Sequence, residues 1–439
     1  MRFKFTDKFD SFYFIGIGGV SMSGLAKYLL SLGKKVGGSD ASPNAYTEEL
    51  AAAGAIINEG ALNDYDLIVY TDAIKETDLR LCEAQKLGKQ IISRGRLLYE
   101  ISRDFETVVA VAGCHGKTTC TAMLAHIFSA AEKEFAVHIG GNDLTFSNFY
   151  YRGNEFFITE ACEYKKNFLL LEPDIAVILN SEPDHIECYG SEAALKQAYI
   201  DFADSAEAVV SLYCDLPIKN SVSFGFDKSA RYYAKNIRVC GDDLTFVACE
   251  GETELGVVKL KVHGKHNVLN ALAAIAAARA AGIGFDAINK GLGEFIGVER
   301  RFEKIGEVNG AVCIADYAHH PNELRAVIRT AKKLSSGKVF VVFQPHTYSR
   351  TKSLFKEFVK VLSPLNNLLI YKTFAAREYF DDAGSALTLS QSIKKSRYGD
   401  DVKDLTAFIS GAEEGDTVLF LGAGDIYNIA KKAVELLQD

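Results

Sequence analysis

Residues Thr107–Ala112 (TVVAVA) form the run that most restricts the possible folds of this chain. Six consecutive apolar or β-branched residues suit a strand buried on both faces, which is typical of a parallel sheet. A glycine-bearing turn follows directly, and residues 118–130 then show the pattern of a helix. Strands that pass into helices through short turns are the repeating unit of α/β folds. The run therefore predicts a parallel sheet covered by helices.

The same alternation recurs along the chain and predicts an α/β fold throughout. We expect strands at 11–17, 35–38, 67–70, 90–92, 107–112, 156–159, 175–179, 208–211, 311–315, 339–343, 367–371 and 417–421, with helices that include 21–32 and 267–281. Residues 228–261 instead show short strands typical of antiparallel pairing. At roughly 100–200 residues per domain, 439 residues suggest three domains, which we place at 1–104, 105–298 and 299–439.

Composition excludes several classes of protein. Lys and Arg total 49 against 57 Asp and Glu, and a net charge of −8 disfavours general nucleic-acid binding. Nine scattered cysteines without a CxxC pair fit neither a disulfide framework nor a zinc ribbon, and suit a reducing compartment. We find neither the core of a signal peptide nor a run apolar enough to span a bilayer. We therefore expect a cytoplasmic protein without membrane insertion.

The turn after Thr107–Ala112 carries the strongest local motif. It reads Gly113, Cys114, His115, Gly116, Lys117, Thr118 and Thr119. A glycine here lets the backbone approach a phosphate, the lysine supplies a point charge, and the following hydroxyl can ligate Mg²⁺. The usual phosphate-loop pattern would need glycine where Val111 stands, so an ordinary strand–turn–helix connection is the alternative.

A second glycine turn, GIGGVS at 16–21, follows the first predicted strand and opens a helix. Asp40 closes the next strand, about 20 residues on, as in a dinucleotide fingerprint. The third glycine of that fingerprint is replaced by Ser21. Three interpretations stay open: an NAD site, a site for another phosphate-bearing nucleotide, or close packing of strand and helix.

Polar residues follow the next strands of the middle region. Glu160 ends one predicted strand, and Asp184 and His185 follow the next one. Ligands of open parallel sheets bind beyond the carboxyl ends of the strands, so we expect these groups on the edge that carries Lys117. Oxygen ligands suit Mg²⁺, although a single residue of this kind at a strand end is more often structural.

Further candidates lie toward the C-terminus. Asn267 and Asn270 share a helix face and could contact an adenine edge, or Asn267 could cap its helix. Arg300 and Arg301, at the second domain boundary, could reach a phosphate or form an exposed ion pair. Two loops, 316–321 (DYAHHP) and 343–350 (FQPHTYSR), are expected to be neighbours at one end of the third sheet. Their arginine could hold a carboxylate, and their histidines lack the spacing of zinc ligands.

Seven segments, taken in order, resemble the Mur ligase family, whose members join an amino acid to a nucleotide-linked muramic acid in bacterial cell-wall synthesis. They are GIGGVSMSGLAK at 16–27, GCHGKTT at 113–119, GKHNVLN at 264–270, GVERRF at 297–302, DYAHHP at 316–321, FQPHTYSRT at 343–351 and GAGDI at 422–426. The resemblance implies an N-terminal Rossmann-like UDP-binding domain, a central P-loop-type ATPase domain with a mostly parallel sheet, and a C-terminal Rossmann-like α/β domain that positions the amino acid.

The resemblance also implies the reaction. ATP would phosphorylate the lactyl carboxylate of UDP-N-acetylmuramic acid, and L-alanine would attack the acyl phosphate, leaving ADP and phosphate. The cofactors would be ATP and Mg²⁺, and the product a peptidoglycan precursor that supports cell shape and division. The protein would be a monomer or weak homodimer.

Residue roles follow from the resemblance position by position. Lys117, Arg301 and His319 would be catalytic. ATP would contact Gly113, Cys114, His115, Gly116, Lys117, Thr118, Thr119, His266, Asn267, Asn270, Arg300, Arg301 and Asp316. The other substrates would contact Gly18, Gly19, Val20, Ser21, Asp40, Tyr317, His346 and Arg350. The metal ligands would be Thr118, Glu160 and His185.

Two positions depart from the family's pattern. The acidic run that often follows Glu160-Ala161 is replaced by CEYKK at 162–166, which retains Glu163 but loses two acidic residues. Cys114 stands where the family usually has Thr or Ser. We expect little loss of binding from this change, because backbone amides do most of the work, and we expect an oxidation-sensitive thiol.

Three alternatives to this function remain at this point. A Mur-type ligase that adds a peptide to UDP-muramic acid would differ only in the loops of the third domain. A nicotinamide-dependent oxidoreductase built on the turn at 16–19 would bind NAD and need no ATP. A catalytically silent nucleotide-binding regulator is disfavoured by Lys117, Glu160 and His185 together.

Overall fold

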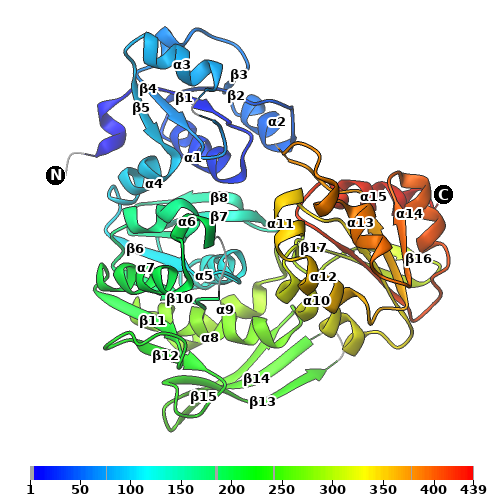
Figure 1. Ribbon diagram of the computed structural model, residues 1–439. Helices are drawn as coiled ribbons and strands as arrows, with labels where there is room; N and C mark the ends of the chain where they lie inside the picture. The colour runs from blue at the N-terminus through cyan, green and yellow to red at the C-terminus, as the bar shows by residue number, and fades with distance from the viewer. Residues whose placement is uncertain (1–3, 76, 183–185, 241–242, 377, 439) are drawn as a thin grey trace. The chain divides into compact units, whose positions relative to one another are not determined.

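A computed structural model of the chain describes residues 4–75, 77–182, 186–240, 243–376 and 378–438. Three sheets with covering helices confirm the predicted three-domain α/β architecture. Internal contacts group residues 1–298 into one unit and 299–439 into a second (Figure 1). The domain limits near 104 and 298 stay a prediction. In the part of the chain that the structure describes, none of the helices combines the length and apolar character that crossing a bilayer requires.

The first sheet contains five parallel strands in the order β3-β2-β1-β4-β5. Four of them were predicted, whereas β3 is too short to show a pattern. The strands are β1 (Ser11–Ile15), β2 (Lys35–Ser39), β3 (Ile56–Ile57), β4 (Leu67–Tyr70) and β5 (Gln90–Ser93), and the helices are α1 (Val20–Ser31), α2 (Ala45–Ala52), α3 (Leu79–Lys86) and α4 (Arg94–Ser102).

The middle sheet has ten strands in the order β15-β14-β13-β12-β11-β10-β6-β9-β7-β8. The strands are β6 (Thr107–Ala112), β7 (Phe135–Asp143), β8 (Ser147–Arg152), β9 (Phe156–Ala161), β10 (Ile175–Ile178), β11 (Ala208–Leu212), β12 (Val222–Gly225), β13 (Tyr232–Cys240), β14 (Asp243–Glu250) and β15 (Thr253–Leu260). Strand β6 lies in the parallel centre of the sheet, and β13–β15 pair antiparallel, as predicted. The hairpin β7–β8 was not predicted, because β7 contains Gly140-Gly141 and β8 is largely polar.

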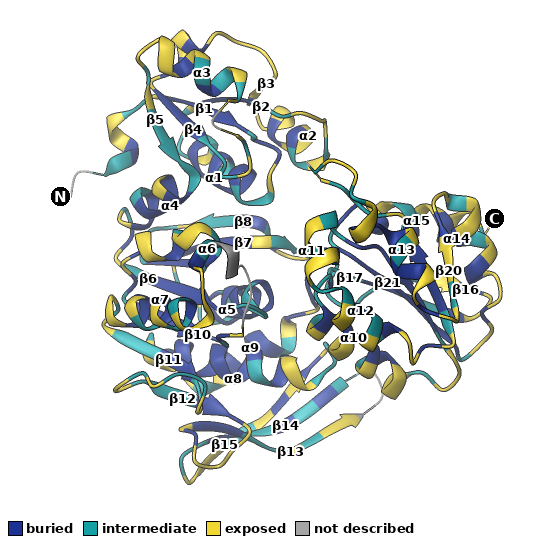
Figure 2. Cartoon of the chain, in the orientation of Figure 1, coloured by how far each residue is buried: buried dark blue, intermediate teal, exposed yellow. Residues whose placement is uncertain are grey.

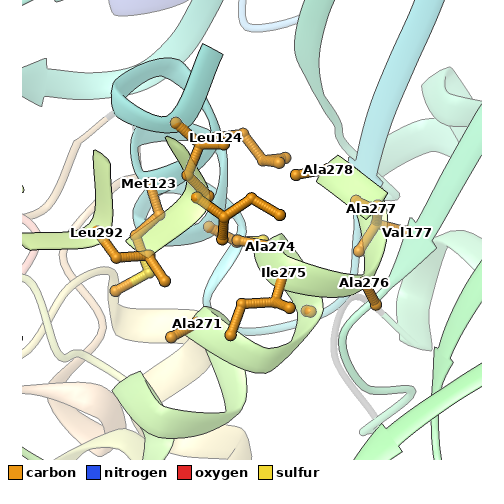
Figure 3. Close-up of a cluster of buried hydrophobic side chains, with 14 of the residues drawn as sticks. Met123, Leu124, Val177, Ala271, Ala274, Ile275, Ala276, Ala277, Ala278 and Leu292 are labelled. Atoms are coloured by element: carbon orange, nitrogen blue, oxygen red, sulfur yellow. The ribbon is translucent and has the colours of Figure 1, made fainter. Parts of the chain in front are cut away.

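Helices cover both faces of the middle sheet. They are α5 (Lys117–Ala130), α6 (Ile186–Tyr189), α7 (Glu192–Asp204), α8 (Lys265–Ala280) and α9 (Phe285–Glu294). The alanine-rich α8 is buried against α5, α9 and the strands of one face, where Ala271, Ala274 and Ile275 lie near Met123 of α5 (Figure 3). Small side chains let these helices approach closely, so the apolar run of α8 is core.

The first two sheets share one hydrophobic core. Phe14 and Leu25 of the N-terminal region belong to the same buried cluster as Phe149 and Phe157 of the middle sheet. Tyr28 of α1 contacts the ring of Phe149, with 5.6 Å between ring centroids. This shared core holds α1 against β7 and β8, so groups at the start of α1 and on this hairpin have a defined geometry.

The unit 299–439 contains a six-stranded sheet in the order β16-β17-β21-β18-β19-β20, parallel except for β16. Its strands are β16 (Glu303–Val308), β17 (Ala311–Asp316), β18 (Val339–Phe343), β19 (Asn367–Tyr371), β20 (Ser396–Gly399) and β21 (Thr417–Leu421). Its helices are α10 (Pro321–Leu334), α11 (Tyr348–Ser353), α12 (Phe355–Leu362), α13 (Ala386–Gln391), α14 (Val402–Ile409) and α15 (Ile426–Glu435). Apolar clusters cover both faces of the sheet, and its inner strands are buried (Figure 2).

Candidate active site

The glycine-bearing turn after β6 has the backbone of a phosphate-binding loop. Gly116 precedes α5 with φ at 86°, in the left-handed region that favours glycine. A Cβ at this position would lie 2.4 Å from Oδ1 of Asn270, so a larger residue would not fit. The start of α5 has no side-chain cap, which leaves backbone N–H groups and the positive end of the helix dipole for an anion.

The ammonium group of Lys117 lies inside this loop. Its Nζ donates to the Gly113 carbonyl oxygen at 2.5 Å and to Glu163 Oε2 at 2.8 Å. The lysine side chain is 14% exposed and that of Glu163 only 3%. Burial opposes the charge on Lys117, but the Glu163 carboxylate and nearby thiols outweigh it and raise the lysine pKa above its ordinary value. Lys117 is therefore a permanent cation beside the uncapped N-terminus of α5.

Asn180, which the sequence did not single out as a site residue, holds the loop in shape. Its Oδ1 accepts from the His115 backbone N–H at 3.0 Å, and its Nδ2 donates to the His115 carbonyl oxygen at 2.9 Å. The Sγ of Cys114 lies 3.3 Å from His115 Nε2, which in turn lies 3.5 Å from Glu182 Oε2. An asparagine two residues after the end of β10, the parallel neighbour of β6, was the signal that could have identified this clamp.

Thr118 and Glu160 both lie against Gly140-Gly141 of β7. A Cβ at Gly141 would be 2.9 Å from Thr118 Cγ2, and one at Gly140 would be 2.7 Å from Glu160 Oε2. The Gly140 N–H donates to Glu160 Oε1 at 2.5 Å. A hydroxyl and a carboxylate together form an oxygen donor set that fits Mg²⁺. The third predicted ligand, His185, lies outside the described residues, as does Asp184.

The predicted adenine-contacting residues lie at the start of α8. Asn267 and Asn270 share a helix face as expected, with Asn270 Nδ2 donating to Asn267 Oδ1 at 3.1 Å. Asn267 does not cap the helix: Gly264 is the N-cap, and Asn267 Nδ2 donates to the His263 carbonyl oxygen at 2.7 Å. His266 is exposed, and Asn270 lies beside Gly116 of the phosphate loop. The two asparagines are therefore next to the loop.

The turn at 16–21 is held by side chains around it. Asp40 Oδ2 accepts from the Gly18 N–H at 2.8 Å, so its carboxylate braces the turn. Gly19 is exposed and precedes α1 without a side-chain cap, while Val20 and Ser21 form the first helical residues. The Oγ of Ser21 lies 2.9 Å from Nε2 of His138 on β7 and 3.4 Å from NH1 of Arg94. The N–H groups of Gly16–Gly19 have acceptors within the protein, so an anionic ligand would meet the uncapped N-terminus of α1 instead.

In the unit 299–439, the two loops predicted as neighbours do meet. The His319 and His346 ring centroids are 5.9 Å apart, those of Tyr317 and His319 are 5.4 Å apart, and Arg350 NH1 lies 3.3 Å from His346 Nδ1. Burial, with the nearby His319 and Arg350, lowers the pKa of His346 to about 4. These four residues combine a neutral imidazole and a guanidinium, which suits a small zwitterion such as an amino acid.

The two arginines after Glu299 differ in their contacts. Arg300 NH2 donates to the carbonyl oxygens of Gly422 and Gly424 at 3.0 and 2.8 Å, so it braces the loop after β21. The Arg301 guanidinium lies 5.1 Å from the Tyr317 ring centroid. Burial raises the pKa of Asp316 to about 6, against the opposing effects of Arg301 and two backbone donors.

Gln344 is a further residue that the sequence did not identify as part of this region. It is buried, its Nε2 donates to Asp425 Oδ1 at 2.7 Å, and its Oε1 accepts from the Ile426 N–H at 3.1 Å. It therefore joins the loop after β18 to the loop after β21. A glutamine directly after a buried strand was the available signal.

Comparisons with known proteins cover the whole chain. Residues 11–106 match the Mur ligase family catalytic domain, 111–278 the Mur ligase middle domain and 300–424 the Mur ligase glutamate ligase domain. The UDP-N-acetylmuramate–L-alanine ligase of Clostridium novyi is 37% identical over 99% of this chain and 100% of its own length. The chain belongs to the Mur ligase family. This membership contradicts two of the hypotheses drawn from the sequence: a nicotinamide-dependent oxidoreductase, and a catalytically silent nucleotide-binding regulator.

Solved structures agree with this membership. The chain is similar to UDP-N-acetylmuramate–alanine ligase of Thermotoga maritima, with a TM-score of 0.85, 28% identity, and 98% and 99% of the two chains covered. A murein peptide ligase of Psychrobacter arcticus shares the fold at a TM-score of 0.74 and 24% identity over 98% and 99% of the chains.

The departure from the Mur ligase pattern at 162–166 has a visible consequence. Burial raises the pKa of the Cys162 thiol, with Glu163 adding to the rise and Lys117 opposing it. An uncharged thiol thus stands where the family often has a carboxylate. Glu163 is consequently the one carboxylate that the described residues place in contact with Lys117.

Proposed function

We propose that this chain is an ATP-dependent ligase that joins L-alanine to the lactyl carboxylate of UDP-N-acetylmuramate, in the cytoplasmic synthesis of peptidoglycan precursors. The observation that carries the proposal is the 37% identity with an L-alanine ligase over practically the full length of both chains. The phosphate loop beside an oxygen donor set supports it, because phosphoryl transfer from ATP needs both.

In the first step, a carboxylate oxygen of the substrate forms a bond to the γ-phosphorus of ATP, and the bond from that phosphorus to the β-phosphate oxygen breaks. Lys117 and the N–H groups of the loop at 113–119 balance the charge of the transferring group. Thr118 and Glu160, with His185, would hold Mg²⁺, which would supply neutralisation of phosphate charge. Asn267, Asn270, His266 and Asp316 contact the nucleoside of ATP.

In the second step, the L-alanine amine attacks the acyl carbon, the C–O bond to the phosphate breaks, and the leaving phosphate takes up the proton that the amine loses. Tyr317, His319, His346 and Arg350 place the amino acid, and Arg301 stabilises the phosphate that departs. Gly18, Gly19, Val20, Ser21 and Asp40 hold the UDP part. We assign residues 1–104 to the sugar nucleotide, 105–298 to ATP and 299–439 to the amino acid, in a monomer or weak homodimer.

Phosphate release in the presence of UDP-N-acetylmuramate, ATP and Mg²⁺ tests this proposal. Amino acids are offered one at a time, with glycine, L-serine, D-alanine and a short peptide as comparison acceptors. Release that requires both UDP-N-acetylmuramate and L-alanine, with a product heavier by one alanyl residue in mass spectrometry, is the expected result. Release that needs no acceptor, or that needs the peptide, would overturn the proposal.

A further inference from the structure

His138 of β7 is a buried histidine with no role in the proposed function. Its side chain lies between the start of α1 and the strand β9, and the residue is 2% exposed. Its Nε2 lies 2.9 Å from Ser21 Oγ and 3.3 Å from the Ser21 carbonyl oxygen. Its Nδ1 lies 3.1 Å from Thr159 Oγ1. The imidazole therefore joins the glycine turn of the first sheet to the residue before Glu160.

The helix α1 has a gap that accommodates this ring. Gly24 lies three residues after Ser21 on the same helix face. A Cβ at Gly24 would be 3.1 Å from His138 Cδ2 and 3.4 Å from the Asn148 carbonyl oxygen. A side chain here would push α1 away from β7, and Ser21 would move out of reach of the imidazole.

A second contact fixes the same helix turn from the neighbouring strand. Asn148 of β8 is fully buried, and its Nδ2 donates to the Val20 carbonyl oxygen at 2.7 Å and to Ser23 Oγ at 2.8 Å. Its Oδ1 accepts from Lys27 Nζ at 2.7 Å. Asn148 and the apolar core thus hold α1 on the hairpin without His138, so the contact of His138 with Ser21 is not needed for this packing.

The surroundings of His138 indicate where its proton lies. Burial lowers the pKa of His138 to about 4, with the Arg94 charge contributing, so the ring is neutral and carries one proton. Nε2 faces two oxygens of Ser21, one of them a carbonyl that only accepts, which places the proton on Nε2. The Thr159 hydroxyl lies 3.1 Å from Nδ1 and donates to the Glu160 carbonyl oxygen at 3.2 Å.

Ser21 then has two donors directed at one hydroxyl oxygen. Nε2–H of His138 and NH1 of Arg94 occupy both of its lone pairs. Because Ser21 is only half-buried, its own hydrogen points to the open side of the turn. There it can donate to an acceptor, such as an oxygen of an anionic ligand at the uncapped N-terminus of α1.

We propose that His138 is a positioning residue that turns the Ser21 hydroxyl into a hydrogen-bond donor for an anionic oxygen of the sugar-nucleotide substrate. The inference rests on the proposed function, because it takes the ligand of this turn to be UDP-N-acetylmuramate. It predicts that loss of His138 weakens the binding of UDP-N-acetylmuramate and not of ATP. This holds although His138 also contacts Thr159, the residue before the proposed metal ligand Glu160.

A double-mutant cycle tests the inference. His138→Leu, Ser21→Ala and the double variant are compared for kcat and for the KM of UDP-N-acetylmuramate and of ATP. Each single change should raise the KM of UDP-N-acetylmuramate on the order of fivefold, as expected for one lost hydrogen bond. The double variant should be no worse than Ser21→Ala, and the KM of ATP should stay within about twofold of the starting value.

Two further variants separate positioning from packing. His138→Gln retains an N–H donor near the place of Nε2 and should restore most of the affinity. Ser23→Ala removes a neighbouring buried hydroxyl that contacts Asn148 and not His138, so the KM of UDP-N-acetylmuramate should stay unchanged. Hydrogen exchange of unliganded protein adds a readout without substrate: His138→Leu should speed exchange at the start of α1 and leave the loop at 113–119 as it is.

Several outcomes would overturn the inference. A His138→Leu variant with the original KM for UDP-N-acetylmuramate is one, and effects that multiply in the double variant are another. If His138→Leu raised the KM of ATP as much as that of UDP-N-acetylmuramate, His138 would be a packing residue and not a positioning residue. Calorimetric titration of the original protein distinguishes these from failure of the proposed function, which would show as no binding of UDP-N-acetylmuramate at all.

Discussion

Two glycine turns in the unit 1–298 both lead into a helix that has no side-chain cap among the described residues, but they differ in how they supply positive charge. Gly19 precedes α1 and Gly116 precedes α5. The turn at 113–119 contains its own cation, Lys117, held by a buried carboxylate. The turn at 16–21 has no cation and is surrounded by Asp40, His138 and Arg94. One turn therefore has its charge built in, whereas the other depends on groups from elsewhere in the fold.

The largest effect is expected from removing the cation of the phosphate loop. Lys117→Ala should lower kcat by on the order of 10³-fold or more, because the developing charge of phosphoryl transfer loses its stabilising group. Steady-state turnover measures this, with circular dichroism to check the fold. Lys133→Ala is the matched control, since that lysine follows α5 and pairs with Glu155 at the exposed surface. A Lys117→Ala variant that retains a tenth of the original activity would show that the turn at 113–119 does not depend on its own cation.

Removing the carboxylate beneath that cation should chiefly affect stability. Glu163→Gln leaves the buried Lys117 charge without its partner, and the free energy of unfolding should fall by about 3 kcal/mol. ATP with Mg²⁺ should recover part of this loss, because phosphate oxygens supply the missing charge. Chemical denaturation with and without ligand measures both effects.

The matched control for Glu163→Gln is Glu155→Gln. Glu155 pairs with Lys133 at the same 2.8 Å but is 36% exposed, so its loss should cost no more than about 1 kcal/mol. If both variants lost the same free energy of unfolding, burial would not distinguish the two ion pairs. The ion pair of Lys117 with Glu163 would then be no stronger than an ordinary surface pair.

A smaller effect is expected at Asn180, which shapes the phosphate loop without carrying charge. Asn180→Ala removes two hydrogen bonds to His115 and should raise the KM of ATP about tenfold, with kcat affected less. Asn154→Ala, which also removes two hydrogen bonds but before β9 begins, should leave the KM of ATP unchanged. A higher KM for UDP-N-acetylmuramate in place of ATP would show that the two turns are not independent.

The smallest effect is a pH dependence confined to the turn at 16–21. The folded pKa of His138 is about 4, below its ordinary value of 6.5, so the unfolded state binds the proton more readily. Local stability is therefore complete above about pH 6.5 and falls as the pH drops toward 4. Hydrogen exchange of residues 16–24, corrected for intrinsic rates, should show this loss in the original protein and not in His138→Leu. An equal loss in both would assign it to other groups.

Much of the site could be predicted because it depends on local pattern. The run Thr107–Ala112 and the residues after it place Gly116, Lys117 and Thr118 at a strand–helix turn, where the structure has them. Parallel strand order likewise brought Glu160 to the edge that carries Thr118. The loops of Tyr317 and His346 were expected to meet for the same reason. Which ligands these residues bind stays a prediction.

Other contacts were not accessible to a reading of the sequence. The hairpin β7–β8 lacks a strong strand pattern, and His138 and Asn148, which hold α1, both lie on it. Asn267 was expected to be a possible helix cap, yet Gly264 takes that position. Asn180 and Gln344 brace loops that are distant in sequence. Their positions after strands are visible in the sequence, but the identity of their partners is not.

The sequence by itself determined most of the parallel strands and where chemically active side chains follow a strand, because these depend on neighbours within a few residues. Tertiary structure alone decided that Glu163 neutralises Lys117, that Asp40 braces Gly18 and that His138 reaches Ser21. The physical reason is that hydrogen bonds and ion pairs act over about 3–4 Å in space, and folding brings together groups that are dozens of residues apart along the chain.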